Sequence, residues 1–95
     1  MQEVDIHHNS DNKKFEYIEN GESAHLMYAI DAPAVWRLTH TLVPKSLGGK
    51  GIASSLVKKA LMHCREHSIA IIPECTFIIT YIKRNPEWED IVLKY

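Results

Sequence analysis

The first half of the chain alternates between apolar and polar side chains with a period of two residues. Residues 15–19 place aromatic and aliphatic side chains between acidic ones, as a strand with one buried face does. Asn20-Gly21 follows, and this pair favours a tight hairpin because both residues tolerate positive φ. With breaks at 10–12 and 31–33, the pattern predicts an antiparallel meander of strands over residues 4–9, 15–19, 23–30 and 35–43.

After Pro44 the apolar positions recur about every 3.6 residues, which is the period of a helix. A stripe of Ile52, Leu56, Ala60 and Cys64 predicts an amphipathic helix over 52–68. The continuous apolar run 69–72 is typical of a buried central strand. We expect a second helix over 77–84, ended by a proline, and a further helical turn over 88–95.

Composition narrows the class of protein. The chain has 95 residues, which suits a single domain over 1–95, and a net charge of −1, which disfavours nucleic acid as the main partner. The sequence shows neither a membrane-spanning apolar run nor a signal peptide at its start, so we expect no membrane partner. Cys64 and Cys75 are then expected to be free thiols in the reducing cytoplasm.

A glycine cluster precedes the first predicted helix. Gly48, Gly49 and Gly51 allow a close approach of the backbone to a ligand, and the first amides of a helix have no internal partner. Such a loop suits a phosphate group, although a flexible linker is the plainer interpretation. The segment is not a P-loop, because Gly51 follows Lys50 where serine or threonine is needed, and no parallel βαβ unit supports a dinucleotide fingerprint.

The order of elements around this loop resembles the GNAT N-acetyltransferases, and most closely the very small GNAT-like proteins. The resemblance rests on five short runs spread over most of the chain, which are His40-Thr41-Leu42-Val43-Pro44, Gly49-Lys50-Gly51-Ile52-Ala53-Ser54, Glu66-His67-Ser68, Pro73-Glu74-Cys75 and Tyr81-Ile82-Lys83-Arg84-Asn85-Pro86. It implies an α/β (α+β) fold: a mostly antiparallel sheet of four to five strands with one long helix and one or two short ones.

The resemblance also implies acetyl-CoA as the cofactor. Its pantetheine arm would bind along Leu42 and Val43, and its pyrophosphate would bind the loop residues Gly48, Gly49, Lys50, Gly51, Ile52 and Ala53. Three residues depart from the family pattern. Ser68 replaces a glycine at the helix end, which costs only a little C-cap stability. Gly48 replaces an arginine, so Lys45, Lys50 or Lys58 would have to supply charge to the phosphates, and Leu42 replaces a carboxylate that often helps to activate the acceptor amine.

Three residues are candidates for catalysis. Cys75 falls between a predicted strand and a predicted helix, where helix amides can lower the pKa of a thiol. In a GNAT-like fold this junction lies near the thioester, so Cys75 is a candidate nucleophile or acetyl carrier, or else a small buried apolar residue. The resemblance makes Tyr81 a candidate acid for the departing thiolate, and His40 a candidate base. Packing roles compete for both.

No metal site is expected. His63 and His67 share a helix face at i, i+4 spacing, but no further ligand completes the set in the sequence, and His7 and His8 point to opposite faces of a strand. Cys64 lies on the apolar stripe and is expected in the core.

The sequence thus predicts an N-acyltransferase that moves an acetyl group to an amine, directly or through Cys75. The acceptor is an unidentified small molecule or protein amine. Because only a short turn separates the first two strands, we expect a shallow acceptor side, in a monomer or weak homodimer. The alternative is a non-catalytic acyl-CoA-binding or interaction domain, which the departures at Leu42 and Gly48 favour.

Overall fold

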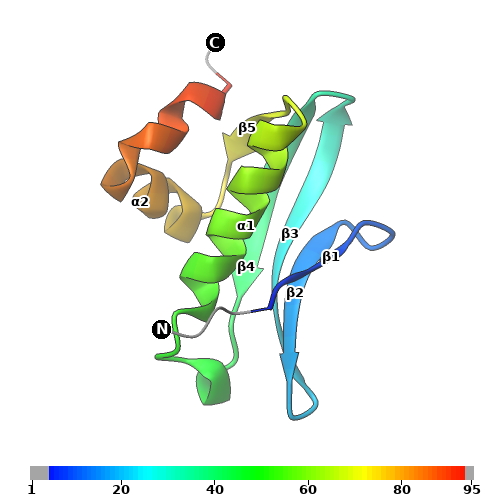
Figure 1. Cartoon of the computed structure of the whole chain (residues 1–95), viewed down its shortest axis with the longest axis vertical. Helices are drawn as coiled ribbons and strands as arrows, with labels where there is room; N and C mark the ends of the chain where they lie inside the picture. Colours follow the sequence, from blue (N-terminus) through cyan, green and yellow to red (C-terminus); the bar gives the residue numbers. More distant parts are fainter. Residues whose placement is uncertain (1–4, 94–95) are drawn as a thin grey trace.

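The computed structural model describes residues 5–93. These residues form a five-stranded sheet in the order β1-β2-β3-β4-β5, in which β1 to β4 are antiparallel neighbours and β4 and β5 are parallel. The strands are β1 (His7–Asn9), β2 (Lys14–Glu19), β3 (Glu22–Ala32), β4 (Val35–Leu42) and β5 (Ala70–Pro73). The expected mixed α/β fold with a mostly antiparallel sheet is confirmed (Figure 1).

The meander follows the alternation in the sequence. Asn20 and Gly21 both have positive φ, 51° and 79°, and join β2 to β3 as a tight hairpin. Phe15 and Leu26 are opposite each other in this hairpin and fully buried, so one face of the sheet is the core face. The predicted break at 31–33 begins two residues too early, because β3 continues through Ala32. An irregularity between Ile30 and Ala32 accommodates Asp31 as an extra residue in the strand.

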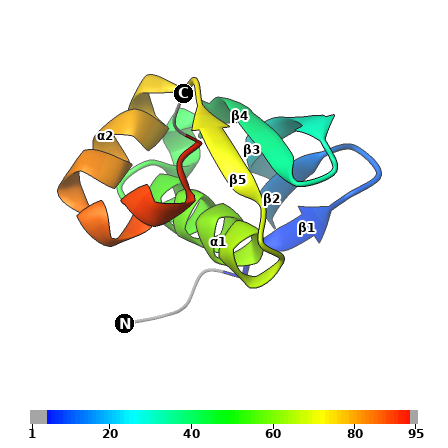
Figure 2. The ribbon, with the colours of Figure 1, turned by 90° about the horizontal axis from the view of Figure 1, so that it is seen from above.

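Helix α1 (Ile52–Glu66) packs on the core face of the sheet against β2 and β3 (Figure 2). Its buried residues are Ile52, Leu56, Val57, Ala60, Leu61 and Cys64, which includes the whole predicted stripe. Burying side chains of this size stabilises the fold by about 1.5–3 kcal/mol for each large one. The helix ends at Glu66, two residues earlier than predicted, because Ser68 adopts the left-handed φ of 56° that terminates it.

The expectation that residues 69–72 form a central strand was wrong. β5 is the last strand in the sheet order, with β4 as its neighbour on one side. On the other side, the described residues form an isolated bridge between Ile71 and Val92. Ile71 is nevertheless fully buried. The apolar run reflects helices packed over the strand, since both α1 and the next helix contact β5.

The second predicted helix is confirmed as α2 (Thr76–Arg84), with Ile78 and Ile82 buried. Its β-branched residues are tolerated because their apolar side packs against the core. The 3₁₀ helices η1 (Lys45–Leu47) and η2 (Pro86–Ile91) complete the described elements; η2 confirms the last predicted turn over 88–91, whereas Val92 and Leu93 are not helical. Val4, Lys94 and Tyr95, which the predicted end elements include, lie outside the described residues.

Candidate active site

The parallel strands β4 and β5 separate part of the way along β4. They pair from Val35 to Leu38, and the Glu74 amide then donates a hydrogen bond of 3.0 Å to the Leu38 carbonyl. Beyond this point β4 continues to Leu42 beside β3, while the chain after Glu74 turns into α2. We call this divergence the β4–β5 fork. Helices α1 and α2 follow the carboxyl ends of its two strands (Figure 1).

The glycine loop leads from β4 into α1. Gly49 and Gly51 have left-handed φ values of 77° and 74°, and Gly51 is the N-cap of the helix. Within the described chain no side chain caps this N-terminus, so its first amides have no side-chain partner at the positive end of the helix dipole. Gly48 has an ordinary φ of −68°, but a Cβ there would lie 3.2 Å from the Lys45 carbonyl oxygen. An arginine at position 48 would therefore need this turn to relax.

Lys50 of the glycine loop forms an ion pair with the β2–β3 hairpin. Its Nζ lies 2.6 Å from Glu19 Oε2, and the Tyr17 hydroxyl donates to Glu19 Oε1 at 2.7 Å. The hydrogen bond with Glu19 raises the pKa of Lys50, and the same bond, followed by that from Tyr17, lowers the pKa of Glu19. The lysine charge in the loop thus already has an anionic partner, which a bound phosphate would have to share or displace.

Cys75 is the N-cap residue of α2, half-buried at the β4–β5 fork. Its Sγ lies 3.6 Å from Thr41 Oγ1, on β4. Burial by itself raises the pKa of this thiol, but the hydrogen bond with the Thr41 side chain acts the other way. The nearby backbone amides of Ile78 and Phe77 also lower this pKa, without a cap hydrogen bond to the sulfur, and the net pKa is below the ordinary value. Cys75 therefore has the environment of a reactive thiol.

Cys64 provides the contrast. It is fully buried on α1, and burial raises the pKa of its thiol to about 12. The prediction that it belongs to the core is confirmed.

Tyr81 and His40 lie in different surroundings. Tyr81 is partly buried on α2, packed against the core, and burial followed by the charge of Glu87 raises the pKa of its phenol. It is therefore protonated at neutral pH, as a proton donor must be. His40 is exposed and pairs with Met27, on the face of the sheet opposite the core, where its ring lies 6.0 Å from that of His25. The structure therefore does not place His40 beside Cys75.

Thr41 is the residue that sequence reasoning missed. Thr39 is an extra residue in β4, because Leu38 pairs with Tyr28 and His40 pairs with Met27. This bulge reverses the alternation, so Thr41 shares the core face with Leu38, and His40 does not. The proline-ended β-branched run gives no sign of a bulge.

Three histidines, His8, His63 and His67, lie close together, and the sequence did not predict that His8 joins the other two. The His63 ring stacks near Trp36, with its centroid 4.5 Å from that of His8 and 4.3 Å from that of His67. Burial, followed by the charge of a neighbouring histidine, lowers the pKa of both His8 and His63. No group of three or more His, Cys, Asp or Glu side chains within residues 5–93 is arranged to hold a metal ion.

A hollow of about 600 Å³ lies at the other end of α1, between its carboxyl end, the start of β5 and η2, and it includes Arg65, Ser68 and Val92. It is separated from the glycine loop by the length of the helix. Among the helices described, none is long and apolar enough to cross a membrane.

A mostly antiparallel sheet, a fork between two parallel strands and a glycine loop that opens a helix together define an acetyltransferase-like fold. Comparison with known proteins identifies the family. The model of the GCN5-related N-acetyl-transferase family matches residues 14–91, and the chain belongs to this family. It is 32% identical over 85 residues to Protein NATD1 of Gallus gallus and of Mus musculus, which covers 87% of this chain and 77% of each relative.

A solved structure agrees with this assignment. A GCN5-like protein of Staphylococcus aureus, studied by NMR in solution, superimposes with a TM-score of 0.74 at 27% identity. The match covers 100% of this chain and 93% of the other. The expected GNAT-like fold is therefore confirmed.

Proposed function

We propose that this protein is an acetyl-CoA-dependent N-acetyltransferase in which Cys75 carries the acetyl group before an amine receives it. The observation that carries the proposal is the position of the Cys75 thiol: it lies at the β4–β5 fork, donates a hydrogen bond to Thr41 Oγ1 and has a lowered pKa near the first amides of α2. Family membership supports the general reaction, and the thiol supports the covalent route.

The glycine loop is the proposed site of the pyrophosphate. The left-handed Gly49 and Gly51 keep side chains away from the backbone amides, and the uncapped start of α1 offers those amides to an anion. Ile52 and Ala53 provide the first helical amides, and Leu42 and Val43 would hold the pantetheine arm. Lys50 would add charge on leaving or sharing Glu19.

In the proposed reaction acetyl-CoA supplies an acetyl group as a thioester. The Cys75 thiolate would accept this group on Sγ by thioester exchange, so that one carbon–sulfur bond forms as another breaks. Tyr81, which is protonated at neutral pH, would donate a proton to the departing thiolate. An amine would then displace Cys75 Sγ and release its proton to the solvent, since the candidate base His40 lies on the face of the sheet opposite the thiol.

The acceptor side is open in this proposal. Cys75 is half-buried and the next two residues, Thr76 and Phe77, are exposed, so a large or protein-bound amine could approach the thiol. We propose that the protein works in the cytoplasm as a monomer or weak homodimer. Both cysteines are free, which suits a reducing compartment.

One feature favours a second function, that of a non-catalytic acyl-CoA-binding domain. Leu42 stands where the resemblance leads us to expect a carboxylate, and this residue is 48% exposed on the sheet face opposite the core. A protein that kept the glycine loop but lost the amine-activating group would bind acetyl-CoA without transferring the acetyl group.

Intact-mass spectrometry after incubation with acetyl-CoA separates these functions. We expect the wild-type protein to gain one acetyl group, Cys75→Ala to gain none, and Cys64→Ala to behave as wild type. Loss of the adduct on addition of an amine would show transfer. Binding of CoA without an adduct would contradict the covalent route, and a screen of amine acceptors would then decide between direct transfer and the binding domain.

A further inference from the structure

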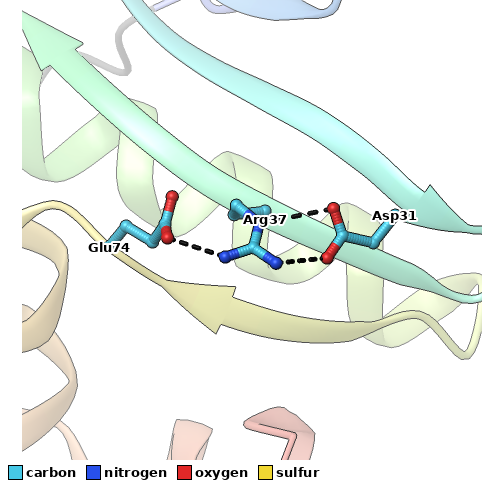
Figure 3. Close-up of polar contacts among 3 residues, drawn as sticks. All are labelled: Asp31, Arg37 and Glu74. Atoms are coloured by element: carbon cyan, nitrogen blue, oxygen red, sulfur yellow. Dashed lines mark hydrogen bonds and ion pairs between the residues drawn. The ribbon is translucent and has the colours of Figure 1, made fainter.

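An arginine joins three strands at the β4–β5 fork. Arg37 of β4 donates from Nε and Nη2 to the two carboxylate oxygens of Asp31, at 3.3 and 2.5 Å, and from Nη1 to Glu74 Oε2 at 2.7 Å. Asp31 belongs to β3, and Glu74 directly follows β5 (Figure 3). We call this group the Arg37 clamp.

The backbone positions of Asp31, Arg37 and Glu74 place their three side chains in contact. Arg37 is flanked by the buried Trp36 and Leu38, so its side chain points to the face of the sheet that α1 does not cover. Asp31 is the residue at the irregularity between Ile30 and Ala32, which directs its carboxylate toward β4. The two-pronged contact with Asp31 leaves the guanidinium a single orientation, with Nη1 directed at Glu74.

Glu74 is held to β4 twice. Its amide donates to the Leu38 carbonyl at 3.0 Å, and its carboxylate accepts from Arg37. Cys75 is the next residue, and its own carbonyl accepts the Ile79 amide as α2 begins. Glu74, which is hydrogen-bonded to β4, is thus the residue directly before the one that carries the thiol.

From this geometry we propose that Arg37 is a positioning residue, which sets the opening of the β4–β5 fork and offsets the Glu74 charge beside Cys75. It does so without touching the thiol. The Arg37 clamp lies on the face of the sheet that α1 does not cover, whereas Cys75 Sγ contacts Thr41 on the core side. This inference rests on the proposed function of Cys75.

The clamp is expected to favour the thiolate form of Cys75 in two ways. The Glu74 carboxylate, left without Arg37, would disfavour a thiolate on the adjacent residue. A looser Glu74 would also move Cys75 relative to Thr41 and to the first amides of α2, which favour that thiolate. Because the Arg37 and Glu74 side chains are 35% and 42% exposed, solvent screens the charge effect and we expect a moderate change.

The test is the rate at which iodoacetamide alkylates Cys75 as a function of pH, followed by peptide mass spectrometry. We expect Arg37→Met to slow alkylation at pH 7.5 about threefold to tenfold, through a higher pKa of the thiol. The double variant Arg37→Met with Glu74→Gln should recover part of the rate, because the unopposed charge is gone. Glu74→Gln alone should react at least as fast as wild type.

Two controls separate positioning from stability. Buried Cys64 reports unfolding in the same sample, and it should stay unmodified in every variant. Arg65→Met removes another exposed arginine, which pairs with Asp90 and lies 4.1 Å over the Trp88 ring, so it should cost stability without changing Cys75 reactivity.

The same pH profile in Arg37→Met and wild type, with Cys64 protected, would overturn the inference. Since alkylation needs no acetyl-CoA, this result is independent of the proposed function. An unacetylated wild-type protein would refute the carrier role of Cys75 and leave the effect of Arg37 on the thiol measurable.

Discussion

The starts of α1 and α2 follow the carboxyl ends of paired parallel strands, yet they present different chemistry. At the start of α1, Gly51 is the N-cap with a φ of 74°, and no described side chain caps the helix amides. At the start of α2, Cys75 is the N-cap with an extended φ of −85°; its sulfur makes no cap hydrogen bond, but the nearby amides of the first turn lower the pKa of the thiol.

This difference shows how the same helix dipole serves two purposes. Where the N-cap has no side chain, the amides remain free for a ligand, and a bulky anion fits. Where the N-cap is a thiol, the amides of the first turn lie near the protein's own sulfur and favour its negative form instead. Binding and reactivity should therefore respond to separate mutations.

The largest effect is expected from Gly51→Val. A β-branched residue at a φ of 74° is strained by about 1–2 kcal/mol, although a Cβ there would meet no neighbour within 4 Å. We expect CoA affinity measured by calorimetry to fall at least about tenfold, because the loop must leave its anion-binding shape.

Gly21→Val is the matched control, since Gly21 has a φ of 79° in the β2–β3 hairpin. It should lower the urea midpoint to a similar extent and leave CoA affinity unchanged. An equal loss of affinity in both variants would show that the glycine loop has no special role.

A smaller effect is expected at the start of α2. Thr41→Val removes the side-chain hydrogen bond that lowers the pKa of Cys75, so the thiolate fraction at neutral pH should fall. We expect alkylation at pH 7.5 to slow about threefold and the rate-versus-pH curve to move toward higher pH. CoA affinity between pH 7 and 9 should remain that of wild type, and a loss of binding would mean that the two helix starts are not separable.

The smallest effect is expected from Glu19→Gln. This change weakens the ion pair that holds Lys50, whose side chain is 50% exposed. CoA should then bind about twofold to fivefold more tightly at low salt, and the gain should shrink as salt screens the charge. Lys50→Met should weaken binding under the same conditions. Unchanged affinity in both variants would remove Lys50 from the proposed site and leave the backbone amides as its main donors.

Much of the fold could be predicted because its determinants are local. Alternation located β2, β3 and β4, the Asn20-Gly21 pair located the hairpin, and four-residue spacing located α1. The glycine loop and the Cys75 junction were also visible, since each depends on residue types at consecutive positions. The strand order was less accessible: the apolar run of β5 indicated burial correctly but not the strand's place at the end of the sheet.

The sequence by itself determined the elements, the apolar faces and the residue types at both helix starts, because backbone φ preferences and periodicity act between near neighbours. Tertiary structure alone decided which side chains meet. The bulge at Thr39 turns Thr41 to the fork and His40 away, the Arg37 clamp joins residues 31, 37 and 74, and His8 reaches His63 from a separate strand. These contacts depend on strand register and bulges, which the hydrogen bonds and packing of the whole sheet select.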